Sequence, residues 1–171
     1  MEFRLRVPRP EHQEADLEAQ EEWKKKLAAQ VERIQLENTD ATVEIWDEDE
    51  HRLGLHPVTR RLWVETGELA IAKVNWKREW LWLYAFVQPQ TGETYWWLLP
   101  YVNTELFERV LEDFAEHFGV GKEKPVIVPL DQAGWHLSEK LKVPFGIHLL
   151  PLPAYSTELQ PAERLWPLVN F

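Results

Sequence analysis

An alternating segment that runs into four consecutive acids occupies residues 41–50, which read ATVEIWDEDE. Val43 and Ile45 alternate with polar residues, and a period of two is typical of a half-buried strand. We therefore predict a strand over the first six of these residues that ends in carboxylates. The same alternation places Asp47 and Asp49 on one face, so either of them can supply the first acid of a site.

The residues that follow predict an antiparallel meander. Two stretches rich in aromatic and β-branched residues flank Pro89-Gln90-Thr91-Gly92, a typical hairpin signal, and a second turn is expected at Thr66-Gly67. The predicted strands are Arg61–Val64, Leu69–Asn75, Trp80–Val87 and Thr94–Leu99.

Helices and strands alternate in the remaining sequence. Asn103 is a favourable N-cap, and the helix after it has one apolar face until Gly119 stops it. Val126–Leu130 is a short apolar strand that leads into Asp131. The other predicted elements are a short helix at Ala133–Leu141, a strand at Ile147–Leu150 and a last helix that begins at Ala162.

The N-terminal region has a different character. Two prolines stand among charged residues in 1–15, which we expect to be an extended linker. From Asp16, a good helix cap, apolar residues recur at helical spacing through Asn38. We therefore divide the chain into residues 1–40, a linker with an amphipathic helix, and residues 41–171, one α/β domain whose last helix is truncated.

The predicted order of elements is that of a ribonuclease-H-like fold. Antiparallel strands come first, then helix, strand, helix, strand and helix, with acids after the first and fourth core strands and at the last helix. We expect a mixed sheet with an antiparallel meander, flanked by helices. Pro129 is unusual in this arrangement because it removes a backbone donor from a strand that should be central.

The composition narrows the classes of function. The chain has no cysteine, so any metal must be bound by carboxylates, imidazoles or water. No apolar run is long enough for a membrane span and no secretory signal is evident, so we expect a cytoplasmic protein without a membrane partner. The formal net charge of -10 disfavours a protein whose main task is to grip nucleic acid. A basic stretch nevertheless follows the acidic block, at Arg60, Arg61, Lys73, Lys77 and Arg78.

Three acids in separate elements suit phosphodiester chemistry. Cleavage of such a bond needs one oxygen activated and another stabilised, which two magnesium ions can do together. Magnesium prefers oxygen ligands and keeps several waters, so a shared site needs about three converging acids. Asp49, Asp131 and Glu163 can converge in this way.

Each of these acids lies in a recognisable motif. The motifs read DEHRLG at residues 49–54, LDQAGWH at 130–136 and YSTELQPAERLW at 155–166. In this order they resemble the three signature blocks of mariner-like bacterial insertion-sequence transposases, which are DDE superfamily endonucleases. The resemblance covers roughly residues 5–170.

The resemblance implies a metal-dependent enzyme that cuts and joins DNA. Asp49, Asp131 and Glu163 would be its catalytic residues and the ligands of two Mg²⁺ ions, for which Mn²⁺ can substitute. Residues 41–171 would form the ribonuclease-H-like DDE catalytic domain. The implied partners are DNA, as transposon ends and target, a second copy of the chain, and a separate helix-turn-helix subunit, because we find only a linker and an acidic helix where the family has its DNA-binding region.

The motifs depart from the family pattern at three positions. Gln132 and Gln160 stand where the family usually has asparagine, and Thr157 stands where it has proline. The interval from Asp131 to Glu163 is slightly shorter than usual, which predicts a trimmed loop between them.

Two other functions compete with the transposase. One is an inactive transposase remnant that folds but neither recognises nor cuts DNA. The other, which the transposase-type motifs disfavour, is a nuclease of the same fold that acts on RNA–DNA hybrids. Metal titration separates enzyme from remnant, and the choice of substrate separates the two enzymes.

Several aromatic residues near the motifs have a structural and a functional interpretation. His136 can touch a phosphate, but we expect a solvent-facing histidine in a short helix. Trp135 is expected to pack rather than to stack on a base. The tryptophans of the hairpin can stack on bases, but alternation favours half of them in the core and half as cover for the N-terminal helix; they include Trp80, Trp82, Trp96 and Trp97.

Overall fold

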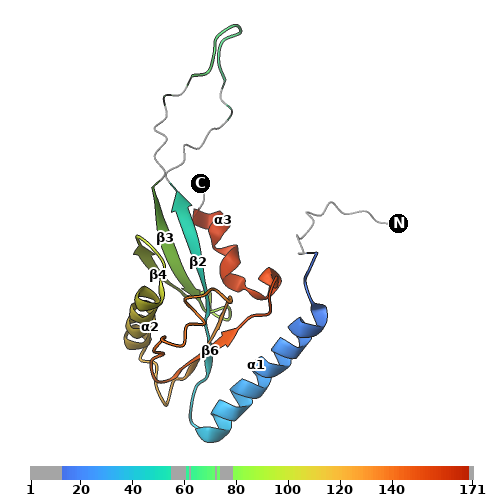
Figure 1. The fold of residues 1–171 in the computed structure, drawn as a ribbon, viewed down its shortest axis with the longest axis vertical. Helices are drawn as coiled ribbons and strands as arrows, with labels where there is room; N and C mark the ends of the chain where they lie inside the picture. The colour runs from blue at the N-terminus through green and yellow to red at the C-terminus, as the bar shows by residue number, and fades with distance from the viewer. Residues whose placement is uncertain (1–12, 55–60, 62, 72, 74–78, 170–171) are drawn as a thin grey trace, which may run out of the picture.

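The computed structural model describes residues 13–54, 61, 63–71, 73 and 79–169, and it is a mixed α/β structure (Figure 1). Among these residues no helix combines the length and the apolar character that a membrane crossing requires. The elements in chain order are α1 (Leu17–Glu37), β1 (Glu44–Ile45), β2 (Asp47–Gly54), β3 (Trp80–Val87), β4 (Thr94–Leu99), α2 (Thr104–Phe118), β5 (Val126–Leu130), β6 (Ile147–Pro151), the 3-10 turns η1 (Thr157–Leu159) and η2 (Pro161–Arg164), and α3 (Trp166–Val169).

Two three-stranded sheets are joined through one extended segment. β1, β5 and β6 pair in parallel, whereas β2, β3 and β4 form an antiparallel meander. β1 leads into β2 through the fully buried Trp46, whose N–H donates to the Ile127 carbonyl of β5 at 3.0 Å. The predicted combination of a parallel part and an antiparallel meander is therefore confirmed.

The acidic block lies inside β2 and not at the end of a strand. We expected the strand to end at Trp46, but the chain stays extended through Gly54 because every residue from Asp47 onward pairs with β3. Asp47, Glu48 and Asp49 are consequently buried. Because buried carboxylates need partners or a changed pKa, this strand is the place to look for a site.

Pro129 is tolerated because of where β1 ends. In β5 the Val126 N–H donates toward β6, to the Gly146 carbonyl at 2.8 Å, whereas Ile127 faces β1. Backbone groups of successive residues point to opposite sides of a strand, so position 129 also faces the β1 side. The last β1–β5 pair is Ile45 with Ile127. Pro129 lies beyond that pair, and its missing N–H breaks no ladder bond.

Helix α2 places its apolar face on the sheets. The Asn103 side chain accepts the Leu106 N–H at 2.8 Å, and Gly119 ends the helix in the left-handed conformation, so both predicted caps are confirmed. The core between α2 and the sheets contains Trp46, Tyr84, Phe86, Phe107, Val110, Leu111, Phe114, Val126, Val128 and Leu130.

Helix α1 is attached beside β6 (Figure 1). Asp16 caps it as predicted, accepting the backbone N–H groups of Glu18 and Ala19 at 3.0 Å. The Trp23 indole N–H donates to the Pro151 carbonyl at 2.9 Å, and the Gln20 amide donates to Glu158. The helix is thereby bonded to both ends of the segment 151–158.

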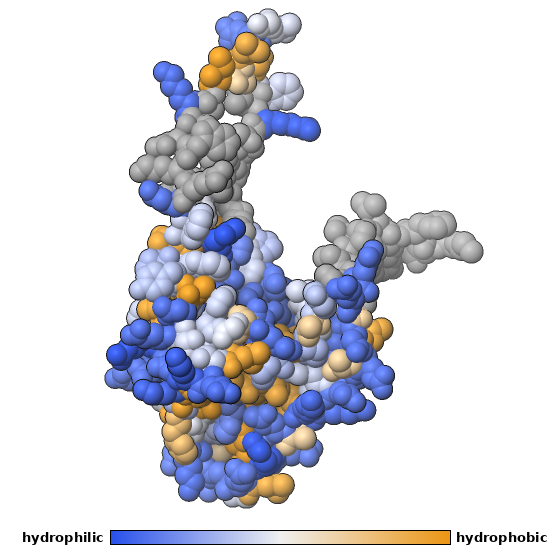
Figure 2. Space-filling model, in the orientation of Figure 1, coloured by the Kyte–Doolittle hydropathy of each residue, from blue (hydrophilic) through white to orange (hydrophobic). Residues whose placement is uncertain are grey.

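Two strands predicted between β2 and β3 do not form in the described residues. The predicted turn at Thr66-Gly67 is present, with the Glu68 N–H donating to the Glu65 carbonyl at 3.0 Å, but its flanks have no strand partner. Residues 63–71 project away from the sheets, and Figure 2 shows apolar side chains exposed there. Residues 62, 72 and 74–75 of the two predictions lie outside the described residues.

Two predicted helices are also corrected. Ala133–Leu141 is a series of turns, because the hydroxyl and carbonyl of Ser138 accept the N–H groups of Lys140 and Leu141 and compete with helix formation. The last helix does not begin at Ala162: Pro161–Arg164 is a 3-10 turn, and α3 follows it.

The hairpin tryptophans are packing residues for the most part. Trp82 and Trp97 pack against the main core, and Trp96 packs with Leu83, Ala85 and Trp166 in a second cluster. The prediction that some of these tryptophans lie in the core is confirmed. The prediction that the others lie under the N-terminal helix is wrong for Trp96, which packs against Trp166 of α3.

Candidate functional site

The three acids of the three motifs line one cavity of about 310 Å³. Asp49 comes from β2, Asp131 from the end of β5, and Glu163 from η2. The rest of the lining comes from the segment after β6, with Gln132 and Gln160 completing it. Parallel β1 and β5 run side by side, so the segment entering β2 and the end of β5 meet at one edge. The fold thus brings together residues that lie far apart in the sequence.

Asp49 is the buried member of the three. Its Oδ2 accepts the Trp166 indole N–H at 2.8 Å. Burial raises the pKa of Asp49 to about 7, against the hydrogen bond from Trp166, and the charge of Glu163 raises it further. The Asp49 carboxyl group is therefore held in place by Trp166, but its environment disfavours the ionised form.

Asp47 has a different environment, although it lies on the same face of β2. Its Oδ2 accepts the Ala162 backbone N–H at 2.7 Å, which ties η2 to β2, and Oδ1 has no hydrogen-bond partner among the residues that the structure describes. Burial raises its pKa to about 8. Asp47 is not among the residues that line the cavity. Asp49, and not Asp47, therefore lines the cavity together with the other two acids.

Asp131 is half exposed at the mouth of the cavity. Its Oδ1 accepts two hydrogen bonds, from the Ala133 N–H at 2.8 Å and from the His136 Nδ1 at 2.9 Å. The bond from His136 holds the pKa of Asp131 below its usual value despite partial burial. The pKa of Asp131 is thus lowered, whereas that of Asp49 is raised.

Glu163 is exposed on η2, and two contacts hold that turn against β2. One is the Ala162–Asp47 hydrogen bond, and the other runs from the Gln160 side chain to the Glu48 carbonyl at 3.2 Å. The Gln132 side chain likewise donates to the Leu152 carbonyl at 2.8 Å. Gln160 thus bonds to β2, and Gln132 bonds to the segment of the cavity wall that follows β6.

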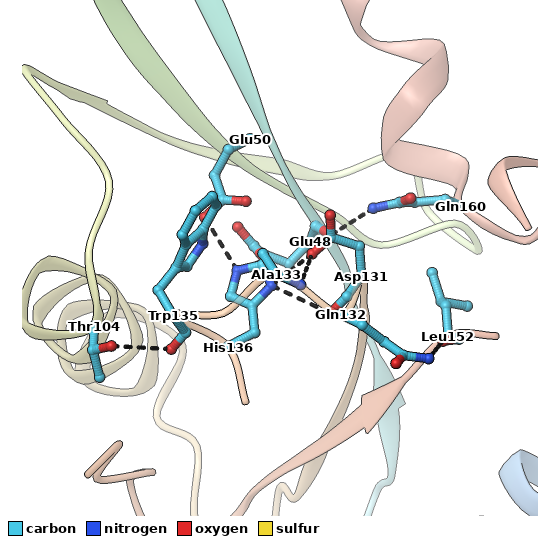
Figure 3. A network of polar contacts seen from close by, with 10 residues as sticks. All are labelled: Glu48, Glu50, Thr104, Asp131, Gln132, Ala133, Trp135, His136, Leu152 and Gln160. Carbon is cyan, nitrogen blue, oxygen red and sulfur yellow. Dashed lines mark hydrogen bonds and ion pairs between the residues drawn. The ribbon is translucent and has the colours of Figure 1, made fainter. Parts of the chain in front are cut away.

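A second cluster of charged groups adjoins the cavity (Figure 3). His136 lies between Glu48, Glu50 and Asp131, with its Nε2 at 3.1 Å from Glu50 Oε1 and 3.5 Å from Glu48 Oε2. Burial opposes the charged imidazolium, but the hydrogen bonds to Asp131 and Glu50 outweigh it and raise the pKa of His136 to about 10. Glu48 is completely buried, and burial raises its pKa well above the usual value.

This second cluster was not predicted from the sequence. We expected His136 to face solvent in a short helix, but it is 4% exposed and lies in a turn, so that prediction was wrong. Trp135 packs against the core as predicted and also donates its indole N–H to Glu50 Oε1 at 2.8 Å. Alternation along the acidic block could have indicated that Glu48 and Glu50 share the face opposite Asp47 and Asp49.

The arrangement suits a hard divalent cation. Carboxylate oxygens from three elements surround the cavity, and no cysteine competes for the metal. Glu48, Glu50 and His136 also have ligand atoms within 4.8 Å of one another, but His136 already bonds two carboxylates. The cavity is therefore the better candidate for a metal centre.

Comparison with protein families gives two matches. Residues 44–170 match the model of the family described as DDE superfamily endonuclease. Residues 1–27 match the model described as winged helix-turn helix, where we expected only a linker and the start of an acidic helix. The second match revises that expectation. Of its residues the structure describes 13–27, which include the first turns of α1.

A curated relative and several solved structures are similar to the chain. An uncharacterized protein, y4pE/y4sA of Sinorhizobium fredii (strain NBRC 101917 / NGR234), is 39% identical over 87 residues, 51% of this chain and 63% of the relative. A Mos1 transposase paired-end complex with the left transposon end has a TM-score of 0.57 at 21% identity, covering 99% of this chain and 53% of that one. The catalytic domain of Mos1 mariner transposase has a TM-score of 0.50 at 17% identity, with 94% and 72% covered.

These similarities confirm the predicted fold. The element order and the mixed sheets match the ribonuclease-H-like catalytic domain of Mos1 transposase. The chain spans about half the length of the Mos1 transposase in its DNA complexes. Because the family match extends over most of the chain, including all three acids of the cavity, this protein belongs to the DDE superfamily endonucleases, a family of nuclease-type enzymes.

Proposed function

We propose that this chain is the catalytic part of a DNA transposase. It would hydrolyse one phosphodiester bond at a transposon end and join the freed 3' hydroxyl to target DNA in the cytoplasm. Asp49, Asp131 and Glu163 would be the catalytic residues and would bind two Mg²⁺ ions, with Mn²⁺ as a substitute. The observation that carries this proposal is that the acids of all three motifs line one cavity.

The donor groups of the cavity fit this cation. Asp131 Oδ2 accepts no hydrogen bond from the part of the chain that the structure describes. Burial, and then the charge of Glu163, raise the pKa of Asp49, and a bound cation would favour its ionised form. Bound magnesium would activate the attacking oxygen and neutralise charge on the phosphate. Two Mos1 complexes solved with Mn and with Mg share the fold, with TM-scores of 0.56.

The residues of the chain would hold the acids in place before DNA binds. Trp166 fixes the Asp49 carboxylate, and Ala133 and His136 fix that of Asp131. Such prior positioning lowers the entropy cost of assembling the reactive geometry. Tyr155, which lines the cavity and is 51% exposed, would be accessible to a DNA strand bound there.

The proposed partners are DNA and further subunits. The net charge of -10 predicts low affinity for DNA that falls steeply with salt. A second copy of the chain and a helix-turn-helix subunit would supply the contacts that read the transposon end. The Mos1 transposase complex with a transposon end supports DNA as the partner, whereas the match of residues 1–27 to the winged helix-turn helix model favours a part of that element within this chain.

Two assays test the proposal. Supercoiled plasmid with Mg²⁺ or Mn²⁺ should be nicked by the wild-type chain, and Asp131→Asn and Glu163→Gln should each abolish nicking. With a helix-turn-helix segment fused to the chain, a duplex with a free 3' hydroxyl at a transposon end should then be joined to target DNA, whereas the chain alone should give only sequence-blind nicking. An equal rate on RNA–DNA hybrids without joining would instead indicate a hybrid nuclease. No nicking by a folded wild-type chain that also binds no metal would indicate the inactive remnant.

A further inference from the structure

His136 links Asp131, which lines the cavity, to Glu50 of the second cluster. It lies in the turn after β5 and is almost completely buried, with the Phe107 ring 4.5 Å from its own ring centre to centre. Its Nδ1 lies 2.9 Å from Asp131 Oδ1, and its Nε2 lies 3.1 Å from Glu50 Oε1. Each ring nitrogen therefore faces a carboxylate oxygen, an arrangement satisfied when both nitrogens carry a proton.

The far end of this chain of contacts is anchored independently. Glu50 Oε1 also accepts the Trp135 indole N–H at 2.8 Å, and the Trp135 carbonyl accepts the Thr104 hydroxyl at 3.4 Å from the first turn of α2 (Figure 3). The His136 ring is thus fixed by β2 and by α2. It cannot rotate away from Asp131 without breaking the bond to Glu50.

The two carboxylate oxygens of Asp131 have different environments. Oδ1 accepts both the His136 bond and the Ala133 N–H, whereas Oδ2 accepts none from the described residues. A carboxylate held by one oxygen presents the other in a fixed direction. Partners that orient a metal ligand in this way typically change metal affinity by about 10- to 100-fold when they are removed.

We propose that His136 is a positioning residue, which holds the Asp131 carboxylate by Oδ1 and leaves Oδ2 to bind the divalent cation. The inference rests on the proposed function, because it takes Asp131 as a metal ligand. His136 itself touches neither cation nor DNA in this account. Its effect is exerted through Asp131, and Glu50 and Trp135 are the residues that keep it in place.

A matched pair of substitutions isolates the bond to Asp131. In His136→Asn the side-chain amide can occupy the position of Nδ1 and donate a hydrogen bond to Asp131. In His136→Gln the amide reaches the position of Nε2 and can donate only to Glu50. Both variants lose the ring and its charge, so a purely structural role predicts equal effects. His117→Gln, on the exposed end of α2, is the control.

Mn²⁺ affinity, measured by titration calorimetry on the full chain without DNA, is the readout. His136→Gln should weaken binding about 10-fold or more relative to wild type, with His136→Asn closer to wild type and both variants equal in melting temperature. Equal Mn²⁺ affinity in the two variants would overturn the inference. If the wild type binds no Mn²⁺, or Asp131→Asn binds as tightly as the wild type, the proposed function fails and this inference fails with it.

Nuclear magnetic resonance of the wild type provides a test that needs no folded His136 variant. The His136 Nδ1–H should give a slowly exchanging, strongly deshielded proton signal that shifts when Mg²⁺ is added and is lost in Asp131→Asn. If that signal is missing, or if Mg²⁺ leaves it unchanged, His136 does not position Asp131.

Discussion

Asp47 and Asp49 share one face of β2, and their contacts separate their roles. Asp47 is turned toward η2, where it accepts the Ala162 N–H, whereas Asp49 lines the cavity and is held by Trp166. Alternation alone left both residues open as the first acid. The motif position favoured Asp49, and the cavity supports that choice.

Substitution of these two residues should separate structure from chemistry. Asp49→Asn should abolish metal-dependent nicking of plasmid DNA, because it removes a charged oxygen from the cavity. Asp47→Asn should keep most of the activity, since its amide oxygen can still accept the Ala162 N–H. Nicking rates at saturating Mn²⁺ measure both effects, and the reverse ranking would show that Asp47 is the first acid.

His136 and Glu48 belong to contacts that local sequence does not specify. Asp49, Asp131 and Glu163 could be predicted because each lies in a motif of local sequence. The buried network around His136 could not, because it forms only when β2 and the turn after β5 meet across a long interval of sequence. A lone histidine in a polar stretch has no local signal of that contact.

Among the helices and strands, the sequence predicted correctly those features that interactions between near neighbours in the chain stabilise. The β3–β4 hairpin and the caps of α1 and α2 agree with the sequence, because turn residues and capping side chains act within a few positions. The strands predicted at 61–64 and 69–75 fail in the described residues, since alternation does not guarantee a partner strand. The helix predicted at Ala133–Leu141 does not form, because Ser138 accepts the N–H groups of Lys140 and Leu141 in turns.

Gly146 fixes the start of β6 and gives a test of the parallel sheet. It has a φ of 90°, and a Cβ at this position would lie 2.8 Å from the Gly121 backbone. Gly146→Ala should therefore lower the free energy of unfolding by about 2 kcal/mol or more. Gly134→Ala, where a Cβ meets nothing within 4 Å, should change it by less than about 1 kcal/mol. Urea titrations compare the two, and equal losses would contradict the close approach at Gly146.

Helix α1 depends on a small number of specific contacts, among them the Trp23 indole bond to the Pro151 carbonyl. Trp23→Phe keeps an aromatic ring but removes that donor, and it should lower the free energy of unfolding by about 1–2 kcal/mol. Leu36→Ala, at an 81% exposed position of the same helix, should change it by no more than about 0.5 kcal/mol. The attachment of α1 would be wrong if Trp23→Phe were as mild as the control in chemical denaturation.

For the whole molecule, a divalent cation should act as a stabilising ligand. Burial, and to a smaller extent the charge of Glu163, raise the pKa of Asp47 and of Asp49, and a bound cation would relieve the repulsion among these carboxylates. At a concentration about 100-fold above the dissociation constant, the gain is about 2.7 kcal/mol, or roughly 5–10 °C in melting temperature. Differential scanning calorimetry with Mg²⁺ against Na⁺ of equal ionic strength measures the shift. Asp131→Asn should abolish this shift in melting temperature. An unchanged shift in that variant would show that the stabilising cation binds outside the cavity.

The position of the cation itself tests the central claim most directly. Crystals of the full chain soaked in Mn²⁺ should show anomalous scattering from manganese in the cavity, within coordination distance of Asp49, Asp131 and Glu163. Glu48, Glu50 and His136 form the competing group of possible ligands. Manganese bound among those three residues, with none beside Asp49, would contradict the account.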